Sequence, residues 1–318
     1  VPSDTMRNPM RSFLAVVAAV WALGSIAAFL YSQQLRVPAS IAVPVALAFL
    51  IELTFYLTIG FDHLRRRWRP VALFASALVP YCVYSIPVHA FDWKRFGLLA
   101  LAAAVVCFWF ERGRHSPARE FLLLAVMAAV VLAKAFKGIY VEPMDGLRAD
   151  AMGQLMWFRI GLVTFLAPGG PPLQLSFLPS SRAFKVGALY FLAFMPVALL
   201  LNKWLHFTHF QPAAGFWWKG PATFIAFLFF VAFYEEVFFR GILQQRLTQW
   251  WGAWPGLLAA SALFGFVHLW FRQFPNYNWV ILTFFIGLAC GRAFTHAGIG
   301  ASIVAHALVV ATWRAFFA

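Results

Sequence analysis

Long apolar runs recur along the whole chain, separated by short polar or basic segments, and this pattern predicts transmembrane helices. A helix needs about 20 largely apolar residues to cross the hydrocarbon core. Ten stretches qualify: 12–31, 38–61, 71–90, 96–110, 119–141, 183–204, 221–243, 253–271, 278–296 and 298–317. The stretch 96–110 is short, 119–141 contains Lys134 and Lys137, and the last two are separated only by Ala297. We therefore predict an all-α protein, a polytopic bundle of eight to ten transmembrane helices, with ten preferred.

Composition and charge placement support this assignment. Of the 318 residues, 63% are hydrophobic and 11% are charged, which excludes a soluble globular domain. The net charge of +14 would also suit a nucleic-acid-binding protein. However, the basic residues gather in short loops beside the spans, as the positive-inside rule predicts. They are Arg7, Arg11, Arg65, Arg66, Arg67, Arg69, Arg112, Arg114 and Arg119. We expect contact with the lipid bilayer, no nucleic-acid partner, and a cytoplasmic N-terminus.

Intramembrane polarity divides the chain into three predicted regions. Residues 1–141 form an N-terminal extension of about five spans, in which Glu52 is the one acidic residue at membrane depth. We interpret Glu52 as a carboxylic acid that is hydrogen-bonded to a neighbouring helix or is close to neutral, in preference to a catalytic group. Residues 142–182 form a polar, interfacial connector, and residues 183–318 hold about five further spans.

Within the connector, the amphipathic stretch 147–167 is expected to lie in the plane of the membrane interface. In that position Trp157 lies at the level of the headgroups, and Arg148 and Arg159 face water. The three cysteines, in contrast, fall within predicted spans without metal-ligand spacing, and we interpret them as small buried apolar residues. They are Cys82, Cys107 and Cys290.

Glu235 and Glu236 are adjacent in the otherwise apolar stretch 221–243. Each carboxylate at membrane depth costs roughly 2.5–3.5 kcal/mol on insertion scales, so such residues indicate chemistry, transport or pairing. Arg240 lies four residues after Glu236, on the same helix face, and predicts an ion pair. Glu235 then points elsewhere, where a buried carboxylate can act as a general base. The alternative is an ion pair that holds helices together, with Glu235 only hydrogen-bonded beside it.

His268 and His306 also lie in apolar sequence, each in a later predicted span. Either histidine alone is more typical of a structural hydrogen bond. Together with two carboxylates and an arginine in successive spans, they predict a buried hydrolytic site. The chain lacks the serine–histidine signature of serine hydrolases and the HExxH helix of zincins.

The motifs EEVFFR (235–240) and FGFVH (264–268) resemble the EExxxR and FxxxH motifs of the CPBP family of intramembrane proteases. That family includes the type II CAAX prenyl endopeptidases and Abi-like proteins. The resemblance covers roughly residues 183–318. It implies that Glu235 activates water, that Glu236 and Arg240 support it, that His268 positions the water, and that His306 stabilises the oxyanion. These five residues are the predicted catalytic set.

One departure concerns the family's third motif, HxxxN, which here reads HALVV, with Val310 in place of the asparagine. A valine cannot donate to an oxyanion, and loss of one such donor commonly costs about 10²–10³ in rate. This departure favours a slower enzyme, a distinct subfamily or an inactive relative.

The resemblance implies an intramembrane endopeptidase that cleaves a membrane-embedded or membrane-anchored protein or peptide precursor, in a prokaryotic inner or plasma membrane. We expect no cofactor. The alternative is zinc or another divalent metal held by Glu235, His268 and His306. Two other functions stay open. One is a catalytically inactive immunity or scaffold protein. The other is an ion-coupled transporter, which would also place acids and histidines at the midplane but is expected to carry polar residues in both halves.

Overall fold

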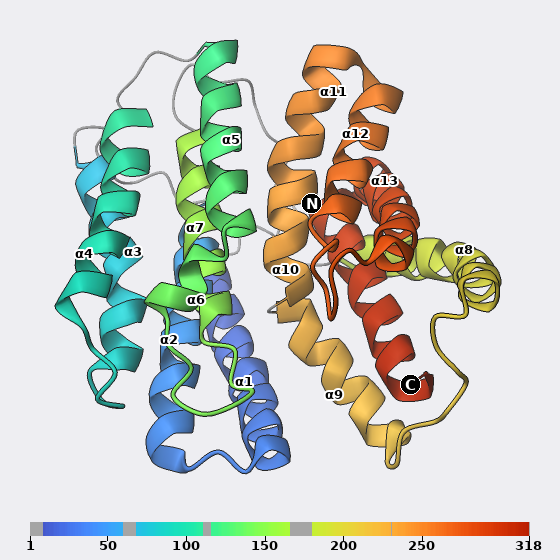
Figure 1. Cartoon of the computed structure of the whole chain (residues 1–318). Coiled ribbons are helices and arrows are strands. Elements are labelled where there is room, and N and C mark those ends of the chain that lie inside the picture. Colours follow the sequence, from blue (N-terminus) through green and yellow to red (C-terminus); the bar gives the residue numbers. More distant parts are fainter. Residues whose placement is uncertain (1–8, 60–67, 111–115, 166–179, 230, 318) are drawn as a thin grey trace, which may run out of the picture. The chain divides into compact units, whose positions relative to one another are not determined.

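The structure is a computed structural model that describes residues 9–59, 68–110, 116–165, 180–229 and 231–317 (Figure 1). The described elements are helical apart from one isolated bridge between Phe210 and Phe317, so the all-α prediction is confirmed. Contacts divide the chain into two compact units, Val1–Ala167 and Pro168–Ala318. The predicted boundaries at 141 and 182 stay a prediction. Several of the basic residues that flank the predicted spans lie outside the described residues: Arg7, Arg65, Arg66, Arg67, Arg112 and Arg114.

The first unit has helix in each of the five predicted apolar runs and a further helix in the predicted connector. They are α1 (Pro9–Leu35), α2 (Ala39–Thr58), α3 (Arg69–Ser85), α4 (Trp93–Ala104) with the π-helical η1 (Val105–Phe110), α5 (Pro117–Leu132), α6 (Ala135–Ile139) and α7 (Asp150–Phe165). Asp92 caps α4 by accepting a hydrogen bond from the Arg95 backbone N–H at 2.8 Å. The predicted stretch 119–141 is broken at Lys134, whose φ of 53° ends α5 and lets α6 start in a new direction.

Helix α7 lies inside the first unit, packed against α2, α3 and α5. Trp157 is 1% exposed and Arg159 is 2% exposed. The expectation that 147–167 lies in the interface plane, with Trp157 at the headgroups and Arg159 toward water, is therefore wrong. Arg148 is largely exposed, as expected, and pairs with Asp150 at 2.7 Å. The physical reason for the error is that the charge of Arg159 is neutralised by a partner within the unit.

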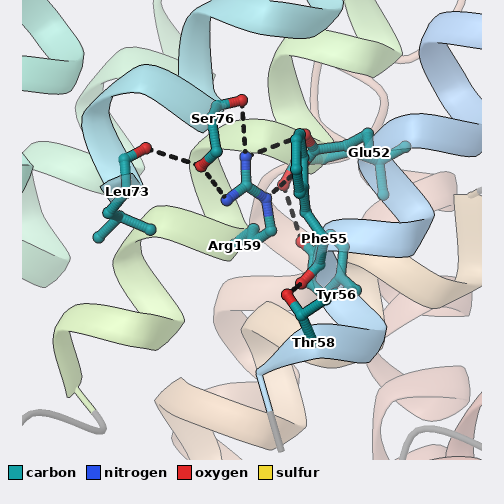
Figure 2. Close-up of polar contacts among 8 residues, drawn as sticks. Glu52, Phe55, Tyr56, Thr58, Leu73, Ser76 and Arg159 are labelled. Carbon is teal, nitrogen blue, oxygen red and sulfur yellow. Dashed lines mark hydrogen bonds and ion pairs between the residues drawn. The ribbon is translucent and has the colours of Figure 1, made fainter. Parts of the chain in front are cut away.

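That partner is Glu52 of α2, and Figure 2 shows the Arg159 guanidinium between Glu52 and Ser76. Arg159 Nε donates to Glu52 Oε1 at 2.6 Å, and Nη2 donates to Oε2 at 3.0 Å. On the other side, Nη1 donates to Ser76 Oγ at 2.8 Å, and Nη2 to the Ser76 carbonyl at 3.2 Å. The guanidinium also lies over the Phe55 ring, 4.8 Å from its centroid. Glu52 is hydrogen-bonded to a neighbouring helix, as expected, but it accepts from an arginine in an ion pair, and the cluster joins α2, α3 and α7.

The second unit contains the predicted site. Its elements are α8 (Ser181–Leu205), α9 (Phe216–Phe229), α10 (Val231–Glu236), the π-helical η2 (Val237–Gln244), α11 (Gln245–Trp251), α12 (Ala253–Phe266) and α13 (Tyr277–Phe316). Helix α13 is interrupted at Ala297 (φ −147°, ψ 22°) and Gly298 (φ 76°, ψ −173°). The break predicted at Ala297 is thus confirmed, and the positive φ of Gly298 is one that glycine adopts without steric cost.

The protein is a polytopic helical membrane protein. Within the described residues, five helices are long and apolar enough to cross a bilayer: Phe13–Leu35, Ala39–Thr58, Ser181–Leu205, Phe216–Trp251 and Tyr277–Phe316. Helix α12 is apolar but shorter. The count of eight to ten spans stays a prediction.

Helix α8 packs closely along α13 at Gly187. A Cβ at this position would lie 2.6 Å from the Ala301 carbonyl oxygen and 2.8 Å from Val304 Cβ. Since a backbone carbonyl cannot move aside cheaply, we expect Gly187→Ala to destabilise the protein by about 1–3 kcal/mol. Gly97→Ala on α4 is the matched control, because a Cβ there meets nothing within 4 Å. Thermal unfolding in detergent measures both, and equal midpoints for the two variants would contradict this prediction.

Candidate active site

Glu236 ends α10, where the helix passes into the π-helical segment η2. Short π-helical segments are rare and occur often at functional sites. Arg240 lies one turn further on, and its Nε donates to Glu236 Oε2 at 3.0 Å. Both side chains are fully buried. The ion pair that the sequence predicted is therefore confirmed.

Glu236 is also bound from the second half of α13. Ser302 Oγ donates to Glu236 Oε2, the same oxygen that accepts from Arg240. His306 Nδ1 lies 2.8 Å from Glu236 Oε1, and because a carboxylate only accepts, Nδ1 donates in this contact. Ser302 and His306 are one turn apart and so share a helix face. Glu236 is thus a buried carboxylate with both oxygens occupied, which suits a group that holds its neighbours in place.

Glu235 has a different environment from Glu236. Its side chain is 18% exposed, and its Oε2 lies 3.8 Å from His306 Nε2. That distance is too long for a direct hydrogen bond. A water molecule is a candidate to join the two groups at such a separation. The imidazole of His306 therefore faces Glu236 with one nitrogen and Glu235 with the other. Of the two adjacent carboxylates, Glu235 is the one that a water and a substrate can approach.

His268 lies just past the end of α12, and its Nδ1 is 2.8 Å from the Phe264 carbonyl oxygen. Its ring packs against the Phe264 ring, with the centroids 5.0 Å apart. The same Phe264 ring lies 5.7 Å from the ring of His306 and 5.1 Å from Arg240 Cζ. Phe264 is therefore a buried aromatic wall shared by three of the five predicted residues.

Sequence reasoning gave no role to two residues of this cluster, Ser302 and Phe264. Each had a signal, since Ser302 precedes His306 by four residues and Phe264 precedes His268 by four. A residue one turn away on the same helix face is the natural neighbour of a candidate site residue.

The alternative prediction was a metal ion held by Glu235, His268 and His306. Within the described residues, no three His, Cys, Asp or Glu side chains gather in an arrangement that could hold a metal ion. The Nδ1 atoms of His268 and His306 are bound to the Phe264 carbonyl and to Glu236, so only Nε2 of each ring is available to a metal ion. Glu235, His268 and His306 are thus not gathered as a three-ligand set in the part of the chain that the structure describes.

Comparison with known families identifies the region that contains the site. Residues 216–312 match the family model described as Type II CAAX prenyl endopeptidase Rce1-like. The match is shorter than the resemblance expected over 183–318, but it contains all five predicted catalytic residues. No curated protein and no solved structure matched the chain. The second unit of this protein therefore carries, over residues 216–312, a domain of the type II CAAX prenyl endopeptidase Rce1-like family.

Proposed function

We propose that this protein is an intramembrane endopeptidase that hydrolyses a peptide bond with a water activated by Glu235. The observation that supports this proposal most strongly is the contrast between the two adjacent carboxylates. Glu236 is fully buried with three partners, whereas Glu235 is partly exposed beside His306 Nε2. One carboxylate thus has the environment of a support and the other that of a general base. The family match over 216–312 points in the same direction.

In the proposed reaction, Glu235 takes a proton from a water, whose oxygen bonds to the carbonyl carbon of the substrate. The resulting tetrahedral intermediate carries a negative oxygen, which a preorganised donor stabilises. His306 is the proposed donor. In its protonated form it keeps the Nδ1 bond to Glu236 and presents an N–H at Nε2. Glu235 then passes its proton to the leaving nitrogen as the C–N bond breaks, which yields a carboxylic acid and an amine. The acid proton then moves to the amine, so that the final products are a carboxylate and an ammonium group.

The remaining groups support this arrangement. Arg240 balances the charge of Glu236, and His268, next to His306 across Phe264, is proposed to orient the water. The proposed substrate is a membrane-embedded or membrane-anchored protein or a peptide precursor. The proposed location is a prokaryotic inner or plasma membrane with the N-terminus in the cytoplasm. No cofactor and no nucleic acid enter the proposal.

The test is a comparison of protein termini in membranes of cells that express the wild type, Glu235→Ala or neither. We expect new termini in a small set of membrane proteins only with the wild type. Glu142→Ala is the control, because Glu142 is an exposed acid of the first unit, outside the family match. Identical termini in all samples would overturn the proposal. A fluorogenic, internally quenched peptide that spans a mapped cleavage site, here called the reporter peptide, then allows kinetics with the full chain in proteoliposomes.

A second candidate, a catalytically inactive relative, is favoured by Val310. This half-buried side chain lies one turn after His306, where the family motif has asparagine. If His306 is the one oxyanion donor on its helix face, we expect Val310→Asn to raise turnover of the reporter peptide by up to about 10². If the pocket has adapted to valine, the unpaired amide instead costs about 1–3 kcal/mol of stability.

Turnover and Tm of the wild type and Val310→Asn distinguish these cases. Val309→Asn is the control, because it makes the same change at the neighbouring position, which is buried. Flat or reduced turnover in Val310→Asn would contradict the expected gain. Turnover that appears only in Val310→Asn would mark the natural chain as inactive.

A further inference from the structure

Ser302 is a fully buried serine whose hydroxyl binds Glu236 directly. The Oε2 atom of Glu236 accepts from Ser302 Oγ and from Arg240 Nε, while Oε1 faces His306 Nδ1 at 2.8 Å. Ser302 belongs to neither recognised motif, EEVFFR or FGFVH, and lies four residues before the histidine of the third. It is therefore a contact that this chain makes in addition to the motif residues.

The hydroxyl has a geometric consequence for the catalytic pair. Ser302 and His306 hold different oxygens of the same carboxylate, so the carboxylate cannot rotate without breaking one of these contacts. Without Ser302, the described partner left to Oε2 is Arg240 of η2, which follows Glu236 by four residues and so cannot tie it to α13. The hydrogen bond that His306 Nδ1 donates to Glu236 orients the imidazole ring. That orientation in turn places Nε2 at 3.8 Å from Glu235 Oε2. A rotated carboxylate thus displaces the nitrogen that faces the proposed base.

The path of α13 makes this contact more important. The helix is interrupted at Ala297 and Gly298, so the rigidity of the first half does not position Ser302 and His306. The second half is held by packing on other helices and by hydrogen bonds. Ala301 and Val304 pack on Gly187 of α8, the end of the helix packs on α9, and two side chains bind Glu236. Ser302 supplies one of these two bonds.

We propose that Ser302 is a positioning residue that fixes the orientation of the Glu236 carboxylate and thereby holds His306 toward Glu235. Its role in catalysis rests on the proposed function above. The molecule contains a matched control in Ser261 of α12. Ser261 is as fully buried as Ser302, but its hydroxyl has no hydrogen-bond partner among the described residues.

The first arm of the test needs no substrate. Infrared spectra of the purified full chain in nanodiscs identify the carboxylate stretching band of Glu236 as the band lost in Glu236→Gln. We expect this band to shift in Ser302→Ala and to return in Ser302→Thr, which keeps a hydroxyl. Ser261→Ala should leave it in place. An unshifted band in Ser302→Ala overturns the proposal.

The second arm is kinetic and uses the reporter peptide. We expect kcat of Ser302→Ala to fall about tenfold with KM within about twofold, because a hydrogen bond to a charged group is lost away from the substrate. Ser302→Thr should recover most of the loss, and Ser261→Ala should match the wild type. A shifted band with unchanged kcat would mean that Ser302 has only a structural role, and it would overturn the proposal that Ser302 positions His306 for catalysis. If the wild type cleaved nothing in the cell, the proposed function would be overturned. A band that still shifted in Ser302→Ala would then support the contact between Ser302 and Glu236 independently of catalysis.

Discussion

Glu235→Gln is expected to lower kcat for the reporter peptide by about 10²–10⁴ while the protein stays folded. This range is what a positioned general base typically contributes. Glutamine keeps the size of the side chain and one acceptor oxygen but cannot take a proton from water. Glu235 is partly exposed and does not belong to the fully buried Glu236–Arg240 pair, so its exchange for glutamine leaves that pair intact. Thermal unfolding in detergent should therefore give a midpoint close to that of the wild type.

Glu236→Gln is the matched comparison, since it makes the same chemical change one residue along the chain. Here the amide leaves the buried Arg240 without its anion. Removal of one partner of a buried ion pair costs about 3–5 kcal/mol, so this variant should lose stability as well as activity. If Glu235→Gln kept turnover within about tenfold of the wild type, the assignment of Glu235 as the base would fail. If Glu235→Gln were the less stable variant of the two, the roles of the two carboxylates would be exchanged.

Local spacing explains which parts of this site could be predicted from the sequence. The pairing of Glu236 with Arg240 follows from residues four apart on one helix, and the break at Ala297 follows from a single residue between two apolar runs. Apart from its spacing of four residues from His306, Ser302 is hard to single out, because a serine adds little polarity to an apolar helix. Its importance comes from Glu236, which lies 66 residues earlier in the chain.

The wrong prediction for α7, that it lies in the membrane interface, also arose because the deciding partner is far away in the sequence. A charged residue between apolar residues suggests a water-facing stripe when only its own helix is considered. Arg159 instead meets Glu52, which is 107 residues away in the sequence, and Ser76 accepts two further hydrogen bonds from the guanidinium. The spacing of residues within one segment carries no information on such a partner. The long-range pairing of charges is therefore the part of this fold that local patterns could not supply.

The same pair bears on the transporter alternative. The first half was expected to be nearly free of intramembrane charge, yet it holds a buried ion pair in which each atom of Glu52 and Arg159 that can hydrogen-bond has a partner. A carrier of ions needs a group that exchanges its partner, whereas this cluster is closed by three helices. We therefore interpret the pair as a structural link among α2, α3 and α7.

This interpretation leads to the second large expected effect, a loss of about 3–5 kcal/mol of stability in the first unit for either Arg159→Met or Glu52→Leu alone. Each change leaves one buried charge without its partner. The double variant removes both charges and should lie much closer to the wild type, because a buried ion pair replaced by apolar side chains is often neutral or stabilising. The coupling energy of the double-mutant cycle should thus approach the sum of the costs of the two single changes. Ser76→Ala should cost less, since the Ser76 carbonyl still accepts from Arg159.

The measurement can separate the two units, because each contains a buried cysteine. Cys107 lies in the first unit and Cys290 in the second, and alkylation during titration with denaturing detergent reports the opening of each. We expect the single variants to expose Cys107 at lower detergent concentration, with Cys290 less affected, and the double variant to restore the protection of Cys107. Additive losses in the double variant would show that Glu52 and Arg159 act independently. Unchanged protection of Cys107 in the single variants would show that the pair does not hold the first unit together.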